Sequence, residues 1–341
     1  VDGDGNAQLR QNAAIIYVDG RPTTLSLDQI PADQIERVEV ITNPSVKFEA
    51  STTGGIINIV MKSNVKPGYN GVITGAAGTN DHYMGNVALN FKQKPIGFSI
   101  NYNYNSFLNP VDGYNYRTNL LNGEAIGYYN TTTKTFFKHQ FQRGSATLDF
   151  YINNRNKLSI SQNMAIGNFK NYDVQSFESK TGDSLSAYGT RATNSLVHFE
   201  NYTTTANYIK TFPKQGKQLT VDVTYNLTLS KSPSDFTTHT YFPPKGLPPN
   251  NPELQINDAA ANGNFYLLAA DYVNPFTDST KLEYGIRSTY RPSDQVLDVS
   301  VYIYTEGKYV ADTYLSSHYK INHLVNSAYI INRLGIYCNH I

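Results

Sequence analysis

Much of the chain alternates strictly between apolar and polar residues. From Ile96 to Asn105 the even-numbered positions are apolar or aromatic, and the odd-numbered positions are Gly, Ser or Asn. The same period of two recurs at 219–229 and 282–291, and less regularly at 148–152 and 158–166. A period of two places one row of side chains on each face of a β-strand. These stretches are therefore predicted to be strands with one apolar and one polar face.

The length of these stretches separates them from ordinary globular strands. They run for about 9 to 13 residues, whereas globular strands usually have about 5 to 6. A tilted strand that crosses a membrane needs about 9 to 11 residues. The polar face is rich in Asn, Thr, Ser and Gly, which suits a water-filled lumen. Tyrosines lie towards the strand ends, where the headgroups would be. After residue 68 we count about eleven or twelve such strands, as in an incomplete transmembrane antiparallel β-barrel.

The predicted connections between these strands are alternately short and long. Residues 92–95 and 153–156 are tight turns rich in Asn, Lys and Pro. The stretches at about 107–134, 167–195 and 231–263 are polar and rich in Gly, Pro and Asn, and they are predicted to be long loops. Short periplasmic turns and long extracellular loops are typical of outer-membrane barrels.

Composition supports a β-rich protein and excludes several classes. The chain has 28 Lys and Arg against 27 Asp and Glu, which argues against a nucleic-acid partner. It has 27 Tyr and 16 Phe, which favour pleated, half-buried surfaces. Its one cysteine, Cys338, has no partner for an internal disulfide. The apolar runs are far shorter than the 18 or so residues that a membrane-spanning helix needs.

Residues 1–63 follow a different pattern, with short elements separated by Gly and Pro. Strands are predicted at 15–18, 38–41 and 56–60. Asp19-Gly20 predicts a turn, and residues 31–36, which begin with Pro31, predict a short helical turn. Gly54-Gly55 predicts a backbone geometry or a close approach that a Cβ would block. Together these elements predict a small α+β unit.

Four motifs give this N-terminal unit a family resemblance. In order they are Val18-Asp19-Gly20-Arg21-Pro22, Ile30-Pro31, the run from Ile35 to Ser45, and the run from Gly54 to Lys62. This series resembles the second half of the plug domain of TonB-dependent receptors, in the subgroup whose barrel is an outer-membrane β-barrel domain. The resemblance implies that 1–63 is the C-terminal part of a plug and that 69–341 is the N-terminal portion of a barrel. We therefore expect the sequence to be an interior fragment of a longer protein.

The resemblance also implies a function and partners. Members of this family bind a scarce ligand of the siderophore, vitamin, glycan or peptide class and import it by energy-coupled plug gating. The implied location is the outer membrane of a Gram-negative bacterium. The implied partners are outer-membrane lipid, an unknown extracellular ligand, and a periplasmic TonB-type energy-coupling protein that binds a box absent from this sequence. A surface lipoprotein is a further candidate partner.

Two other functions were weighed against this one. The first is a non-transporting outer-membrane β-barrel protein, for adhesion or envelope biogenesis, that has kept a plug-like segment. The second is a soluble β-rich carbohydrate-binding or enzymatic domain, for which strands of about six residues and a carboxylate pair would be expected. An intact energy-coupling box upstream would favour transport over the first alternative.

The motifs that carry chemistry elsewhere are incomplete in this sequence. A calcium loop beginning at Asp2 would need Glu at its twelfth position, which is Ala13. His318 and His323 lie five apart without Cys, Asp or Glu to complete a metal site. No phosphate-binding glycine loop or G-x-S-x-G motif occurs. The sequence therefore predicts no enzyme, no cofactor and no metal site, and it leaves the ligand-binding residues unassigned.

Overall fold

The computed structural model describes residues 8–9, 12–13, 15–18, 21–22, 35–41, 55–61, 68–243, 251–277 and 280–334. Almost all of these residues are in strands, and none of them is in a helix. In this part of the chain there is accordingly no helix long and apolar enough to cross a membrane.

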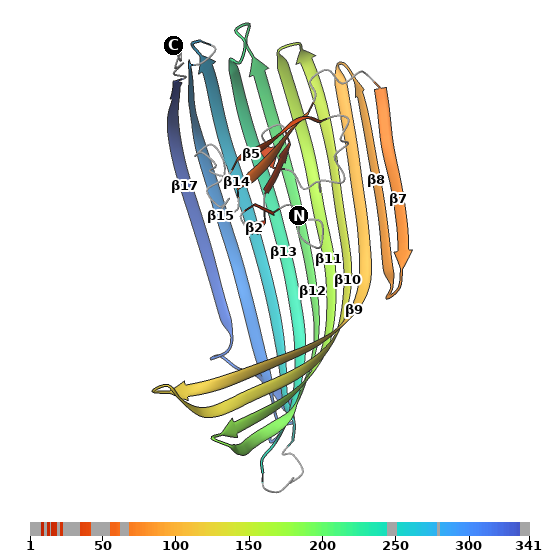
Figure 1. Ribbon diagram of the computed structural model, residues 1–341, viewed down its shortest axis with the longest axis vertical. Helices are drawn as coiled ribbons and strands as arrows, with labels where there is room; N and C mark the ends of the chain where they lie inside the picture. The colour runs from red at the N-terminus through yellow and green to blue at the C-terminus, as the bar shows by residue number, and fades with distance from the viewer. Residues whose placement is uncertain are drawn as a thin grey trace, which may run out of the picture.

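Most of the described chain forms one antiparallel sheet, the wall, in which each strand up to β15 pairs with its neighbours in sequence (Figure 1). β15 pairs on its other side with both β16 and β17. The eleven strands seen in the described residues agree with the sequence prediction. They are β7 (Gly68–Gly78), β8 (His82–Gln93), β9 (Ile96–Leu121), β10 (Glu124–Asn153), β11 (Asn156–Thr181), β12 (Ser184–Thr211), β13 (Gln218–Tyr241), β14 (Glu253–Pro275), β15 (Thr280–Ile303), β16 (Lys308–Ala311) and β17 (Ser317–Leu334).

The predicted long loops are instead mostly strand. β9 and β10 stay paired as far as Leu121 and Glu124, and β11 and β12 as far as Thr181 and Ser184. The prediction of loops at 107–134 and 167–195 was therefore wrong, and of 231–263 the residues 231–241 and 253–263 are strand. Continued pairing satisfies the backbone N–H and C=O groups. Asn122-Gly123, both with positive φ, suits a tight hairpin turn. Figure 1 shows these two hairpins bending away from the rest of the wall.

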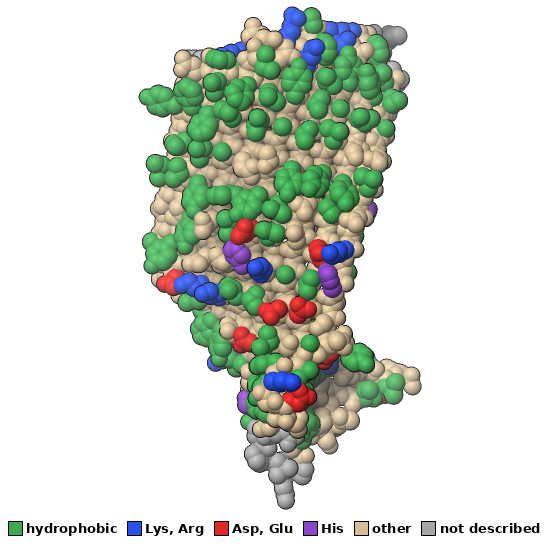
Figure 2. Space-filling model, turned by 180° about the vertical axis from the view of Figure 1, so that it is seen from behind, with side chains coloured by type: hydrophobic (Ala, Val, Ile, Leu, Met, Phe, Trp, Pro, Cys, Tyr) green, Lys and Arg blue, Asp and Glu red, His purple; other side chains and the backbone are tan. Residues whose placement is uncertain are grey.

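The strand register gives the wall two distinct faces. Residues directly opposite one another in a sheet point to the same face. On β13, the residues Leu219, Val221, Val223, Tyr225, Leu227 and Leu229 share one face. Facing residues on the neighbouring strands, such as Ala206 and Leu268 opposite Val223, extend this row. Figure 2 shows the result as a broad apolar band. We call this the outward face, and the opposite one the lumen face.

The height of the apolar band matches a membrane. The ten steps from Leu219 to Leu229 span roughly 33 Å along the strand, or roughly 25 Å of height at a tilt of about 40°. Lys231 follows Leu229 on the same face and Lys217 precedes the strand, so charge bounds the band at both ends.

Polar side chains within the outward face bond to one another. Tyr102 donates to Gln142 (2.8 Å) and Tyr225 donates to Asn264 (2.9 Å). Ser288 donates to Asn326 at 2.7 Å. Unpaired polar groups are costly in lipid, so this lateral pairing makes the polar positions tolerable.

The two ends of the wall differ, and the difference sets its orientation. Short connections at 94–95, 154–155 and 212–217 lie at one end, whereas the extended hairpins lie at the other. Short turns are periplasmic in outer-membrane barrels and long connections extracellular. The predicted tight turns at 92–95 and 153–156 are confirmed, apart from the outer residues, which belong to the strands.

A small separate sheet precedes the wall, with strand order β4-β3-β6-β5. Its strands are β3 (Ile15–Val18), β4 (Arg21–Pro22), β5 (Ile35–Ile41) and β6 (Ile56–Met61). The two strands that precede it in sequence, β1 (Gln8–Leu9) and β2 (Asn12–Ala13), pair with each other. Ile56 and Ile59 form its core, with 0% and 2% of their surface exposed. In Figure 1 this sheet lies on the side of the wall opposite the apolar face of Figure 2.

The three predicted strands of this unit are confirmed, and one detail is corrected. Ile35 and Glu36, predicted to end a helical turn, belong to β5, where alternation continues into Val38 and Val40. Several predicted features lie outside the described residues. They are residues 31–34 of the helical turn, the turn at Asp19-Gly20, Gly54, Cys338 and the end of the chain after Leu334. Gly55 has a φ of 95°, which explains glycine there.

Candidate functional site

Within the membrane the lumen face carries a polar ladder. Ser159 donates to Asp149 (2.6 Å), which also pairs with Lys157 (3.0 Å). Further along the same row, the side-chain amide of Asn207 donates to Asp222. Ser159 and Asn207 are each only 1% exposed. These polar groups form hydrogen bonds and ion pairs with one another, so this part of the lumen face has a structural role in the wall.

Beyond the membrane band, towards the extracellular end, the lumen face becomes aromatic. Rings from four neighbouring strands meet there, and we call them the lumen aromatic cluster. Its members are Phe107 of β9, Phe137, His139 and Phe141 of β10, Phe169 of β11, and Phe199 of β12. His139 lies three residues from Gln142, which is level with the edge of the outward apolar band, or roughly 10 Å along the strand.

His139 is at the centre of the cluster. Its ring centroid is 4.6 Å from that of Phe107 and 4.3 Å from that of Phe169, the two residues directly opposite it on the neighbouring strands. Phe169 also stacks on Phe199, with centroids 5.6 Å apart and planes 13° apart. Offset-stacked and edge-to-face contacts of this kind each stabilise by about 0.5–1.5 kcal/mol beyond area burial. The rings therefore hold one another in place.

A glycine allows the rings to lie flat on the wall. Gly167 lies opposite Phe141 on one side and Phe199 on the other. A Cβ at this position would be 2.2 Å from Cε1 of Phe199 and 2.8 Å from Cε2 of Phe169. The ring of Phe199 therefore covers the backbone of Gly167, and any other residue there would displace it.

Three buried polar atoms in this region have no hydrogen-bond partner in the described part of the chain. They are Nδ1 of His139, Oδ1 of Asn105 and Oδ1 of Asn171. Asn105 lies directly opposite Phe141, and Asn171 directly opposite Phe137, so all three atoms belong to the cluster or its border. A buried polar atom without a partner costs about 1–3 kcal/mol. All three atoms are already covered by neighbouring protein atoms, so this cost lies inside the packed cluster and not at a surface open to a ligand.

The chemistry of the surface is that of a binding site. Arg143, next along the lumen face, lies 4.8 Å over the ring of Phe141. Rings and a guanidinium suit a ligand that carries flat or apolar groups and negative charge. Among the described residues no group of three or more His, Cys, Asp or Glu could hold a metal ion. His318, weighed as a metal ligand from the sequence, contacts Asp294 at 2.7 Å.

The sequence did not identify these residues. The signal was present in 137–141, where Phe, His and Phe alternate with Lys and Gln. Within the membrane part of β10 the apolar residues are even-numbered, as in Leu148 and Phe150, whereas in this stretch they are odd-numbered. That change of parity places the aromatic row on the lumen face, and only the register reveals it.

The wall also matches known families by sequence. Residues 210–335 match the outer membrane protein beta-barrel family. The chain is 23% identical over 297 residues to the rhizobactin receptor of Rhizobium meliloti (strain 1021). By these two matches the chain is similar to outer-membrane β-barrel proteins of the TonB-dependent-receptor type. The alignment covers 82% of this chain but only 37% of the rhizobactin receptor.

Solved structures give a consistent but weaker likeness to this outer-membrane barrel segment. The siderophore receptor PiuA from Acinetobacter baumannii aligns at 14% identity and a TM-score of 0.43, covering 97% of this chain and 57% of that one. The ferric yersiniabactin uptake receptor FyuA from Yersinia pestis aligns at 12% identity and a TM-score of 0.35, covering 93% and 52%. With TM-scores below 0.5, these alignments carry no argument about function.

Proposed function

We propose that this chain is part of a receptor that imports a ligand of the iron-siderophore class across the outer membrane. In this proposal residues 1–63 are the C-terminal part of the plug and residues 69–341 the N-terminal portion of the barrel. A periplasmic TonB-type protein supplies the energy by pulling on the plug. The similarity to the rhizobactin receptor supports the ligand class.

The observation that carries the proposal is the lumen aromatic cluster. It lies on the inner face of the wall, on the extracellular side of the membrane band, where an arriving ligand would first contact the barrel. Its rings suit apolar or flat groups, and the guanidinium of Arg143 beside them suits negative charge. Adhesion or envelope biogenesis requires no such surface inside the lumen.

Uptake by whole cells tests this proposal. Cells that express the full-length protein would be given rhizobactin loaded with radioactive iron, with and without a protonophore that collapses the proton gradient. We expect uptake that the protonophore abolishes. Iron uptake that equals that of cells lacking the protein would refute rhizobactin as the ligand, and uptake that persists without the gradient would refute energy coupling.

A matched pair of variants tests the surface itself. Phe137→Ala removes a ring from the cluster, and Phe136→Ala removes its neighbour, which is 53% exposed on the opposite face of the same strand. Loss of one ring contact of about 1–1.5 kcal/mol predicts binding weaker by roughly 5- to 13-fold for Phe137→Ala. Phe136→Ala is expected to bind as the wild type does. Equal affinities for the two variants would exclude the cluster as the ligand surface.

A further inference from the structure

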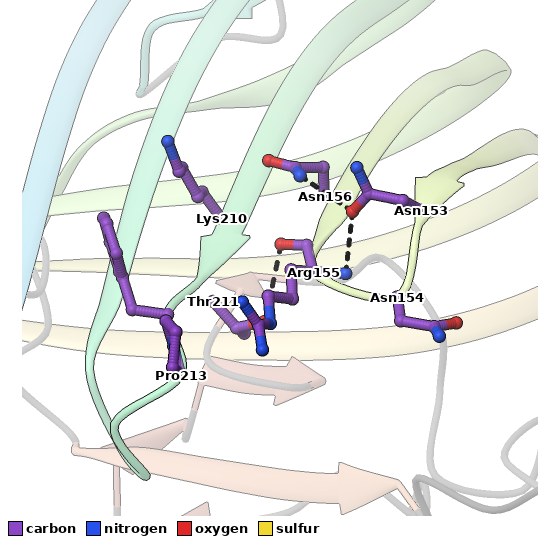
Figure 3. A pocket seen from close by; sticks show the side chains of 8 residues that line it. Asn153, Asn154, Arg155, Asn156, Lys210, Thr211 and Pro213 are labelled. Atoms are coloured by element: carbon purple, nitrogen blue, oxygen red, sulfur yellow. Dashed lines mark hydrogen bonds between the residues drawn. The ribbon is translucent and has the colours of Figure 1, made fainter.

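The periplasmic end of the wall contains a hollow between two neighbouring turns. Its lining comes from Asn153–Asn156, which join β10 to β11, and from Lys210 to Pro213 at the end of β12 (Figure 3). The hollow has a volume of about 580 Å³, within the range of small-ligand sites. The backbone N–H of Thr211 donates to the carbonyl of Arg155 at 2.8 Å and ties the two segments together. The hollow is therefore a built feature of two joined turns.

Hydrogen bonds within the first turn fix its side chains. Oδ1 of Asn153 accepts from the backbone N–H of Arg155 (2.9 Å) and from Nδ2 of Asn156 (2.8 Å). Oδ1 of Asn156 accepts from the hydroxyl of Tyr208 at 2.6 Å. Both amide oxygens are thus occupied, and the amide NH₂ of Asn153 remains for a further acceptor. The turn offers donors rather than acceptors to the hollow.

The hollow is also positively charged. Lys157 and Lys281 at this end of the wall pair with Asp149 and Glu283. Other cations at this end have no carboxylate within ion-pair distance in the part of the chain that the structure describes. These are Lys92, Lys94, Arg155, Lys210, Lys214 and Lys217, and Figure 2 shows Lys and Arg gathered along this edge. Arg155 and Lys210 line the hollow itself.

Its position is the level of the lipid headgroups. Lys210 lies opposite Asn156 and Leu219 on the outward face, in the last row of the apolar band. Its ammonium is 5.3 Å from the ring of Phe212, which in turn packs edge-on against Tyr272. Aromatic rings with Lys at this depth are typical of a membrane interface.

We propose that this hollow binds the phosphate headgroup of an anionic phospholipid in the periplasmic leaflet. Arg155 and Lys210 contact the phosphate oxygens, because a guanidinium and an ammonium match phosphate in charge and geometry. The amide of Asn153 donates to the headgroup, and Phe212 packs against the glycerol and the start of the acyl chains. The surplus of cations that have no carboxylate partner in the described residues selects an anionic headgroup over a zwitterionic one.

Native mass spectrometry of the full-length protein tests this site. The protein would be released from detergent micelles that contain phosphatidylglycerol or phosphatidylethanolamine, and the retained lipids counted. The test variant is Arg155→Gln with Lys210→Gln. The control is Lys134→Gln with Lys170→Gln, which removes two exposed cations from the outward face of β10 and β11, on the extracellular side of the apolar band. Heat-dependent migration on gels checks that each variant barrel is folded.

We expect the wild type to retain phosphatidylglycerol in preference to phosphatidylethanolamine. At about fivefold for each cation, the test variant should bind phosphatidylglycerol roughly 30-fold more weakly, with the control unchanged. Equal losses in the two folded variants would overturn the proposal, as would equal retention of the two lipids. Displacement by millimolar glycerol phosphate would assign the site to soluble phosphates and overturn the lipid assignment.

Discussion

Replacing Gly167 by alanine tests whether the lumen aromatic cluster is held together as the structure shows. A Cβ there would be 2.2 Å from the ring of Phe199, too close for any non-bonded carbon pair, so the ring must move. Phe199 stacks on Phe169 at 5.6 Å and contacts Phe141 at 5.7 Å. Losing two contacts of about 0.5–1.5 kcal/mol each predicts a loss of about 1–3 kcal/mol of unfolding free energy. The cost of overpacking a site is of the same size.

A double-mutant cycle isolates the cause. Once Phe199→Ala has removed the ring, the two contacts of a Cβ at Gly167 with Phe199 are gone and its 2.8 Å contact with Phe169 remains. In that background Gly167→Ala should cost less than about 1 kcal/mol, which gives a coupling of about 1–2 kcal/mol. Urea unfolding of the full-length protein in lipid vesicles, followed by tyrosine fluorescence, provides the free energies.

The control for this cycle is Gly113→Ala in β9, which also lies on the extracellular side of the apolar band. A Cβ at Gly113 would meet no atom within 4 Å, so its effect should stay within about 0.5 kcal/mol. If Gly167→Ala cost the same with and without the Phe199 ring, the packing of that ring on the glycine would be refuted. A Gly167→Ala variant as stable as Gly113→Ala would also refute it.

Two further predictions concern the small sheet. Asn58 donates to Glu39 at 2.7 Å and, with Arg37, holds the pKa of that carboxyl below its usual range. Because the pKa of Glu39 is lower in the folded state, its ionised carboxyl stabilises the small sheet at pH values above the unfolded-state pKa. This stabilisation is lost as the pH falls through the folded-state pKa. In the wild type, protection of the amides of β5 and β6 from exchange should therefore decrease in that pH range. Glu39→Gln should abolish this acid-dependent step; an unchanged step would refute the assignment. Gly55 has a φ of 95°, so Gly55→Ala should lower the free energy that protects the β6 amides from exchange by about 1–2 kcal/mol. Gly68→Ala, where a Cβ meets no atom within 4 Å, should leave that protection unchanged.

The membrane part of the wall could be predicted because its two faces meet different solvents. From Leu219 to Leu229 every second residue must suit lipid, and the residues between them must suit the lumen. Because the environment alternates from one residue to the next, the sequence alternates between apolar and polar residues with a period of two. The same holds for 96–105 and 282–291, all of which are strand.

Outside the membrane both faces of a strand meet water, and the period disappears. Residues 112–119 read Asp-Gly-Tyr-Asn-Tyr-Arg-Thr-Asn, which is indistinguishable from a polar loop. Their strand geometry comes from pairing with β10, a partner that the local pattern does not reveal. The aromatic cluster was missed for a related reason. Its rings come from four strands, and only the register places Phe107 and Phe169 on either side of His139, with Phe199 next to Phe169.

The register also says which part of the protein can move. β10 pairs with β11 without a shift from Gly127 to Tyr151, so the polar ladder at Asp149 and the aromatic cluster at His139 belong to one continuous hydrogen-bonded element. Moving the cluster relative to the membrane would break that ladder of backbone bonds. In the described part of the chain, by contrast, no strand of the small sheet pairs with a wall strand. Displacing the small sheet breaks no backbone bond of the wall there. If the proposed receptor function holds, the wall serves as a rigid, preorganised ligand surface. The segment that contains β3 to β6 is then the part that moves to open a path through the barrel.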